Sequence, residues 1–255
     1  GQRALALAVM LGHVGLQARV QMVLGRVYYD VGDYARAIES LERNVATLQG
    51  TLLSERFGTN GSVAVASRAH LSLCHAERGA FTEGLAIAVE GQRLAETVNN
   101  PFRLIEACYG VSVVYVRQGE MQRALPVLER ALGLCQDAHI PLFVPSIAAA
   151  LGLVYALEGR VAAGLTLVEH GVEQAVAIGR ARSLAPAIAC LSETYLLANR
   201  WEDAHTRALQ AVDLARQYQQ RGHQAWALWL LGESAACQPS PAVEAATGHY
   251  RQALT

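Results

Sequence analysis

Histidine, serine and acidic residues are the side chains of this sequence that could perform catalysis or bind a metal, and their spacing favours neither. His70 and His75 lie five positions apart, whereas two metal ligands on one face of a helix lie four apart. The sequence contains no HExxH, GxSxG, GxGxxG or P-loop motif. Serines such as Ser67 and Ser72 have no plausible base beside them in the sequence. We therefore predict no catalytic residue, no metal site and no cofactor, and hence a protein that is not an enzyme.

The charged residues exclude several classes of function. All 21 basic residues are Arg, which excludes a Schiff-base lysine and a P-loop lysine within this chain. The formal net charge of −1 gives no support for a nucleic acid or an acidic membrane as partner. No uninterrupted apolar run reaches the roughly 18 residues that a bilayer span requires. Because we interpret the first residues as a helix rather than as a signal peptide, we expect a cytoplasmic protein that contacts neither nucleic acid nor membrane.

The cysteines number five and form no CxxC pair. In a chain of 255 residues that is 52% hydrophobic, free thiols fit a large core. We interpret all five as reduced core residues, with a disulfide or metal role as the alternative. These residues are Cys74, Cys108, Cys135, Cys190 and Cys237.

A short break between two apolar segments recurs along the chain. The breaks begin at Gly32, Gly79, Gly119, Gly159 and Asn199. The last four positions lie 40 residues apart, and the first gap of 47 places an insertion within residues 49–62. A Leu and a Tyr four positions apart, such as Leu151 and Tyr155, keep the same register. Self-similarity at a fixed period predicts a repeat architecture.

Each repeat has the pattern of a helical hairpin: a first helix, a tight turn and a second helix. The first helices are expected near residues 18–31, 63–78, 104–118, 145–158, 185–198 and 223–237. Residues 1–15 are expected to form the second helix of a preceding unit. We thus predict an all-α solenoid of about six antiparallel helix pairs, forming one domain over residues 1–255. Its units are approximately 18–48, 63–98, 104–137, 145–179, 185–219 and 223–255.

A small residue after each break predicts close contact between the helices of a hairpin. These residues are Ala37, Gly84, Ala124, Gly164 and Ala204. Within a helix, Gly is less favourable than Ala by about 1 kcal/mol. We therefore expect Gly84 and Gly164 where a larger side chain would push the two helices apart.

The hairpins resemble tetratricopeptide repeats, whose pattern is Trp-x2-Leu-Gly-x2-Tyr on the first helix and Ala-x3-Phe on the second. Leu24-Gly25-x2-Tyr28 fits the first-helix pattern, and Ala37-x3-Leu41 fits the second. Leu151-Gly152-x2-Tyr155 also fits. The Trp is absent throughout, and the period of 40 exceeds the family's usual length of about 34. The resemblance implies a right-handed superhelix whose first helices line the concave side.

More narrowly, the chain resembles the C-terminal tetratricopeptide-like region of bacterial multidomain signalling ATPases, some of which carry an adenylate-cyclase or DNA-binding domain. The segments that carry this resemblance are residues 55–84 and 220–233. It implies a regulatory domain in signal transduction that senses or binds and restrains a catalytic part. Because helical patterns run to both ends, we also expect a fragment of a longer chain.

One stripe of each first helix is expected to point into the concave groove. The candidate partner-binding residues on these stripes are Arg19, Met22, Arg26, Tyr29, Glu106, Tyr109, Arg117, Glu193, Trp226, Trp229 and Glu233. Ala and Leu fill most other stripe positions, and this composition suits an amphipathic peptide or helix. Large aromatic side chains dominate interface energetics, so Trp226 and Trp229 are the expected anchors.

Two interpretations of these stripes remain open, and so do two functions. The stripe residues either bind a partner or pack on one another in a tight superhelix or beneath other domains. The expected function is a non-catalytic scaffold for a peptide, a partner protein or neighbouring domains of the same polypeptide. Self-association through uncapped ends is a further expectation. The alternative is a sensor whose groove holds a small effector and controls an attached ATPase, cyclase or transcription-regulator module.

Overall fold

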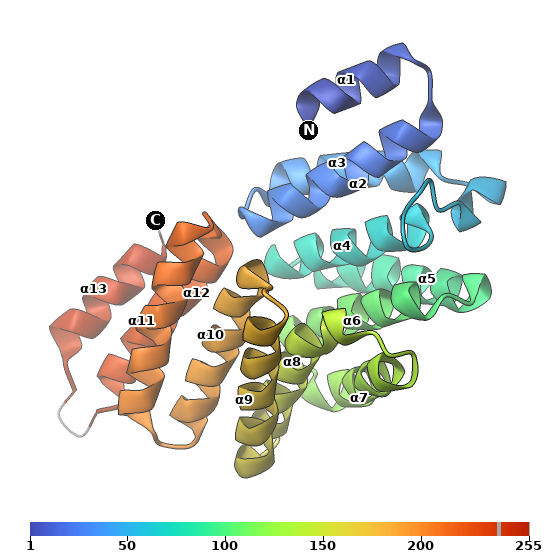
Figure 1. Cartoon of the computed structure of the whole chain (residues 1–255). Coiled ribbons are helices and arrows are strands. Elements are labelled where there is room, and N and C mark those ends of the chain that lie inside the picture. The colour runs from blue at the N-terminus through green and yellow to red at the C-terminus, as the bar shows by residue number, and fades with distance from the viewer. Residues whose placement is uncertain (239–240, 255) are drawn as a thin grey trace. The chain divides into compact units, whose positions relative to one another are not determined.

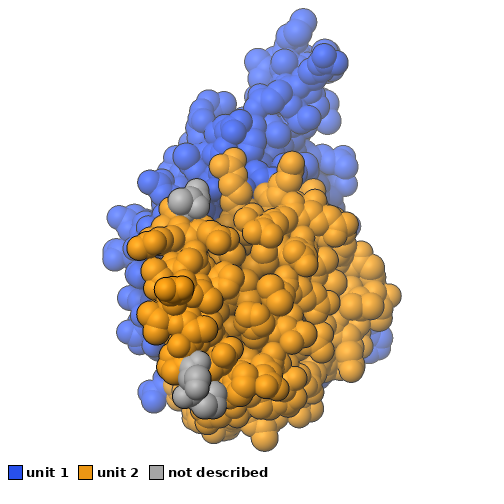
Figure 2. Space-filling view, turned by 90° about the vertical axis from the view of Figure 1, so that its left-hand side faces the viewer, with its two compact units in different colours: residues 1–140 blue, residues 141–255 orange. Residues whose placement is uncertain are grey.

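The computed structural model describes residues 1–238 and 241–254, and every regular element within these residues is a helix. The prediction of an all-α fold is confirmed. The chain divides into two compact units, Gly1–Ile140 (unit 1) and Pro141–Thr255 (unit 2), shown in blue and orange in Figure 2. Among the described residues, no helix combines the length and the apolar character needed to cross a membrane.

Unit 1 contains three helix pairs and one additional helix, α1 (Gln2–Met10), at its start (Figure 1). The pairs are α2 (Val14–Asp30) with α3 (Tyr34–Thr47), α4 (Val63–Glu77) with α5 (Phe81–Val98), and α6 (Pro101–Gln118) with α7 (Met121–Asp137). The first helices α2, α4 and α6 contact one another in this order. The repeats of unit 1 therefore stack in chain order.

Unit 2 begins with a short 3-10 helix and then contains three further pairs. Its elements are η2 (Pro141–Phe143), α8 (Val144–Leu157) with α9 (Val161–Ala177), α10 (Ala181–Leu197) with α11 (Trp201–Gln217), and α12 (Arg221–Ala236) with α13 (Val243–Ala253). All six predicted first helices are present, although α2 and α10 each begin four residues earlier than expected. The arrangement of the pairs as one continuous domain stays a prediction, because the two units are defined separately.

The turns between paired helices explain why Gly recurs at the breaks. Gly32 and Gly119 have φ angles of +79° and +85°, a left-handed backbone that residues with a Cβ rarely adopt. Asn199 adopts the same region with φ +57°, and Asn is among the side chains that tolerate it best. Asp33 then caps α3, because its Oδ1 accepts a hydrogen bond from the backbone N–H of Arg36 at 3.2 Å.

Small residues bring the helices of each hairpin into contact, as predicted. A Cβ on Gly164 in α9 would lie 2.5 Å from the carbonyl oxygen of Gly152 in α8. A Cβ on Gly84 in α5 would lie 3.1 Å from the Cβ of His75 in α4. A larger side chain at either position would overpack the contact and separate the two helices.

The predicted insertion between α3 and α4 is a folded segment of unit 1. It contains the 3-10 helix η1 (Gly50–Ser54). Leu53 and Phe57 pack against the core residues Ala18 and Met22 of α2. The insertion is therefore fastened to the first helix of its own repeat.

Four of the five cysteines are buried, as predicted, whereas Cys237 is exposed. Cys237 is the C-cap residue that directly follows α12. The prediction that it belongs to the core is wrong, because apolar periodicity does not show where a helix leaves the core.

Gly164→Ala is expected to lower the free energy of unfolding by about 1–3 kcal/mol, because the added methyl group overpacks the contact with Gly152. Gly248→Ala in α13 is the matched control, since its methyl group would meet no atom within 4 Å. The control should gain up to about 1 kcal/mol from helix propensity. Urea denaturation, monitored by circular dichroism, measures the free energy of unfolding of both variants. Equal changes in this free energy would contradict the close contact between Gly164 and Gly152.

Candidate binding site

Five side chains of unit 1, which we call the tyrosine cluster, gather where α2, α4 and α6 adjoin the start of α3. They are Tyr29, Tyr34, Glu77, Tyr109 and Arg117. The ring centroids of Tyr29 and Tyr34 lie 5.8 Å apart. Arg117 donates to Glu77 Oε1 through Nη2 at 3.0 Å and Nε at 3.2 Å. Tyr109 and Glu77 both lie close enough to Tyr29 to affect its titration. The structure thus brings together three predicted residues: Tyr29, Tyr109 and Arg117.

The phenols of Tyr29 and Tyr34 stay protonated. Burial raises the pKa of Tyr29 well above its usual value, and the carboxylate of Glu77 raises it further. The pKa of Tyr34 is raised for the same two reasons, in the same order. A neutral phenol both donates and accepts a hydrogen bond. The cluster therefore offers neutral polar groups and one compensated ion pair.

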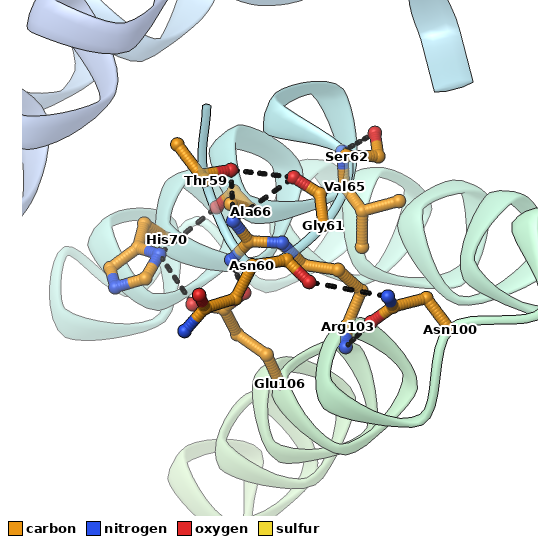
Figure 3. A network of polar contacts seen from close by, with 10 residues as sticks. All are labelled: Thr59, Asn60, Gly61, Ser62, Val65, Ala66, His70, Asn100, Arg103 and Glu106. Carbon is orange, nitrogen blue, oxygen red and sulfur yellow. Dashed lines mark hydrogen bonds and ion pairs between the residues drawn. The ribbon is translucent and has the colours of Figure 1, made fainter. Parts of the chain in front are cut away.

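A second polar cluster, the Arg103 network, joins the insertion to α4 and α6 (Figure 3). The buried Arg103 donates through Nη2 to Thr59 Oγ1 at 3.1 Å and to the carbonyl oxygen of Gly61 at 3.3 Å. Its Nη1 pairs with the buried carboxylate of Glu106. His70 Nδ1 approaches the other oxygen of that carboxylate at 3.7 Å. Glu106, a predicted partner-binding residue, is therefore engaged inside the protein.

The two titratable groups of the Arg103 network have shifted pKa values. Burial alone would raise the pKa of Glu106, but the charge of Arg103, with a smaller effect of His70, outweighs it and lowers the pKa. Burial lowers the pKa of His70, and Glu106 opposes this only in part. His70 Nδ1 also lies 2.9 Å from the carbonyl oxygen of Ala66, so the neutral ring carries its proton on Nδ1. At neutral pH the network thus contains one ion pair and one neutral imidazole.

The other predicted residues of α2 divide between surface and core. Arg19 and Arg26 are exposed. Arg26 lies close enough to Glu106 to lower its pKa. Met22 is only 5% exposed and packs in the core with Ala18. The side chain of Met22 therefore belongs to the core of unit 1.

The predicted residues of unit 2 bond to neighbouring helices. Trp226 Nε1 donates to Glu193 Oε2 at 3.2 Å, and its ring packs against the core of unit 2. Glu233 Oε1 accepts a hydrogen bond from the Tyr250 hydroxyl at 2.8 Å. Burial and the hydrogen bond to Glu233 raise the pKa of Tyr250 to about 12. Trp229 is 40% exposed, which makes it the more available of the two tryptophans.

Sequence reasoning missed Glu77, His70 and Arg103, which support the face formed by the first helices of unit 1. The repeat period contained a signal for one of them. Glu77 and Arg117 lie 40 positions apart and therefore occupy the same place on successive first helices. No such signal marks Arg103, because its partners Thr59 and Gly61 lie in the irregular insertion.

One serine of unit 2 lies beside a histidine, but its geometry does not suit nucleophilic attack. Ser234 Oγ lies 3.0 Å from His205 Nδ1, but its side chain is buried and its hydroxyl donates to the carbonyl oxygen of Leu231. A substrate could not reach this hydroxyl. Within the described residues, no group of three or more His, Cys, Asp or Glu side chains could hold a metal ion.

Comparison with protein families finds the tetratricopeptide repeat at two places, residues 22–52 and 107–138. The first match covers part of α2, all of α3 and the start of the insertion. The second match covers part of α6 and all of α7. Comparison with curated proteins found no matching sequence.

Solved structures similar to this chain are helical repeat proteins. A Rap protein complexed with competence and sporulation factor has a TM-score of 0.71 at 13% identity, over 93% of this chain and 63% of that one. The Rap conjugation gene regulator of plasmid pLS20, in complex with a Phr peptide, has a TM-score of 0.69 at 14% identity, over 95% and 63%. A signal transduction ATPase with a tetratricopeptide repeat sensor, from Pyrococcus horikoshii, has a TM-score of 0.59 at 12% identity, over 94% and 35%. At these identities the likeness establishes the fold alone.

His70→Gln is expected to make the stability of the protein less dependent on pH between 7 and 5. The pKa of His70 is lowered in the folded state, so the unfolded chain binds the proton more readily and the wild type loses stability as the pH falls through about 6.5. One such group changes the unfolding free energy by at most about 1.4 kcal/mol per pH unit. Urea denaturation at several pH values measures the slope.

The control for this measurement is His139→Gln, because His139 is an exposed residue outside the Arg103 network. Its slope should match that of the wild type. If His70→Gln also keeps the wild-type slope, His70 is not held neutral in the folded protein.

Proposed function

We propose that this chain, a tetratricopeptide-like helical repeat protein, is a non-catalytic scaffold that binds a protein segment on the first helices of unit 1. The observation that carries the proposal is the tyrosine cluster. Three first helices of successive repeats place Tyr29, Glu77, Tyr109 and Arg117 together, and Arg26 is exposed on the same stripe as Tyr29.

The chemistry of this face suits a polypeptide ligand. Tyr and Arg are enriched among the residues that dominate interface energies, because each combines a large contact area with hydrogen-bonding groups. The ion pair between Arg117 and Glu77 already fixes two of these side chains. A partner would therefore order few additional rotamers on binding.

The Arg103 network joins two of the helices that form the face, α4 and α6. It fastens the insertion to α6 through Thr59 and Gly61 and connects α6 to α4 through Glu106 and His70. Side chains carried by helices that buried contacts hold in place are positioned more precisely than side chains on loops. The network thus has a positioning role in the proposal, and Glu106 is not proposed as a direct contact.

Unit 2 offers a second proposed contact, Trp229. Its exposed fraction of 40% is large for an aromatic side chain. Trp226 supports this region through its bond to Glu193. Because the ring of Trp226 packs against the core, we assign Trp226 mainly a structural role.

Two of the similar structures motivate a peptide as the ligand. One Rap protein is complexed with competence and sporulation factor, and the other is in complex with a Phr peptide. The second candidate function is a sensor domain for an attached ATPase, because the structure from Pyrococcus horikoshii combines such an ATPase with a tetratricopeptide repeat sensor. Both candidates use the same face and differ in the size of the ligand.

Peptides selected by phage display on the immobilised chain are expected to depend on Tyr109 and Arg26. Tyr109→Ala and Arg26→Ala should each raise the Kd at least about tenfold, since truncation of a central anchor costs about 1.4 kcal/mol or more. Fluorescence anisotropy with a labelled peptide measures the Kd. Trp229→Ala, measured in the same way, reports whether unit 2 also contributes.

The matched control is Arg43→Ala on α3, because Arg43 is an exposed arginine of a second helix that pairs with Glu39. Its Kd should equal that of the wild type. Selected peptides that bind Tyr109→Ala and Arg26→Ala as tightly as the wild type would place the binding site elsewhere.

A further inference from the structure

The turns that join successive hairpins of unit 2 lie side by side. They comprise residues 141–143 before α8, residues 178–180 between α9 and α10, and residues 218–220 between α11 and α12. Arg180 Nη1 donates to the carbonyl oxygen of Leu142 at 3.0 Å. One period later, Gln220 Nε2 donates to the carbonyl oxygen of Arg182, also at 3.0 Å. We call the surface at these turns the turn row, and its exposed residues are Leu142, Val176, Ile178, Arg182, Arg216 and Arg221.

Positive charge collects on the turn row without acidic residues nearby in the sequence. Three of its exposed residues are arginines, and Arg180 adds a fourth positive charge. Within the described residues, neither Arg216 nor Arg221 forms an ion pair with a carboxylate. The segments that contain the turns and most of the following first helices have no Asp or Glu, and these segments are residues 141–157, 174–192 and 214–232.

The opposite ends of the same helices have a different charge. Glu158 follows α8, and Glu202 and Asp203 lie in the first turn of α11. Arg200 pairs with Asp203 there at 2.7 Å. The two helices of each hairpin are antiparallel, so the turns within hairpins lie at the other edge of unit 2 (Figure 1). Basic and acidic residues are thus mixed at that edge, whereas the turn row is basic.

The helices that begin at the turn row add to its positive potential. Neither α10 nor α12 has an acidic residue in its first turn or a side chain that caps its first N–H groups. The N-terminal end of a helix carries a partial positive charge of about half an elementary charge. Carboxylates brought to the turn row would therefore be attracted by the arginines and by these helix ends.

Apolar side chains are exposed on the same turns. Val176 is 63% exposed, and Leu142 and Ile178 are 39% and 36% exposed. Val176 occupies the place in its turn that Arg216 occupies in the next turn, 40 residues later. Branched apolar side chains that gather beside arginines give a surface on which a partner can bury apolar area and pair charges.

We propose that the turn row docks an acidic, amphipathic segment of a partner protein. Its carboxylates pair with Arg182, Arg216 and Arg221, because guanidinium groups bind carboxylates through two parallel hydrogen bonds. Its apolar side chains cover Leu142, Val176 and Ile178. These three residues favour a protein over a nucleic acid, since a phosphate backbone would pair with the arginines but leave the apolar side chains uncovered. The proposal is independent of the tyrosine cluster in unit 1.

A peptide library displayed on phage tests the turn row. Its peptides have Leu, Ile or Val at the apolar positions of an amphipathic helix and Glu or Ala at the other positions. A second library replaces every Glu by Gln. Selection on the immobilised chain is expected to enrich peptides from the first library only. The Kd of a selected peptide, measured by fluorescence anisotropy, should rise with salt concentration because salt screens exposed charges.

Charge reversal at the turn row discriminates it from other sites. The double variant Arg182→Glu with Arg221→Glu should raise the Kd of the selected peptide at least about tenfold, because like charges then meet. Both changes place an acidic residue in the first turn of a helix, where the helix dipole favours it. The matched control is Arg3→Glu with Arg93→Glu, two exposed arginines of unit 1 whose reversal changes the net charge equally. Its Kd should equal that of the wild type.

A second pair of variants tests the apolar contact. Val176→Gln should raise the Kd about fivefold or more, because the apolar area of the valine is no longer buried on binding. Leu209→Gln is the control, since Leu209 is 46% exposed in the middle of α11, away from the turns. The control should leave the Kd unchanged.

Three outcomes would overturn the proposal. Selection could enrich the Gln library as strongly as the Glu library, or the double charge reversal could leave the Kd unchanged. A DNA duplex or a phosphatidylserine vesicle could displace the peptide, bind more tightly and lose its binding in the same double variant, which would assign the turn row to phosphates. Circular dichroism establishes that the variants are folded. Arg182→Gln with Arg221→Gln, which removes the charges without reversing them, should give a smaller rise in Kd.

Discussion

The close approach of two helices within each hairpin is the contact on which the rest of this structure depends. Gly164 lies so near Gly152 that a single added carbon would meet a backbone oxygen at 2.5 Å. Because the helices are that close, the first helices of successive repeats also lie side by side within each unit. The short distance between the two helices of a hairpin therefore determines which side chains of successive repeats contact each other.

The polar contacts of unit 1 follow from this stacking. Residues one period apart meet on adjacent first helices, as Glu77 and Arg117 do. Their ion pair leaves little net charge beside Tyr29, whose phenol is kept protonated mainly by burial. A face built in this way is polar enough to recognise hydrogen-bonding groups and apolar enough to release water on contact.

The hairpins could be predicted from the sequence because their signals are local and repeat along the chain. Gly at a turn indicates a positive backbone φ, and a small residue after the turn indicates a short distance between the two helices. Both signals recur with the same period along the chain. The partners of Trp226 and Glu106 could not be predicted in this way, because they depend on which rotamers reach across to another helix. Met22 shows the same limit, since periodicity locates a stripe but does not show which part of it the insertion covers.

The Arg103 network was unpredictable for another reason. Thr59 and Gly61 lie in a segment without regular periodicity, so no pattern places them beside α6. The length of the insertion was predicted from the irregular first gap, but its path depends on side-chain packing such as that of Phe57 against Gly15. Sequence patterns are thus uninformative for irregular backbone, although Thr59 and Gly61 in this segment accept hydrogen bonds from the buried Arg103.

Neighbouring tyrosines on α2 show how one helix separates a structural role from the proposed binding role. Arginine guanidinium groups near the turns stack at 3.6–4.9 Å on the tyrosines that mark the repeat. The pairs are Tyr28 with Arg36, Tyr115 with Arg123, Tyr155 with Arg160, and Tyr195 with Arg200. Tyr29 follows Tyr28 and points about 100° further around the helix, toward Glu77 and Tyr109. Tyr28 thus packs against Arg36 within its own hairpin. Tyr29 instead lies with Glu77 and Tyr109 of the following first helices.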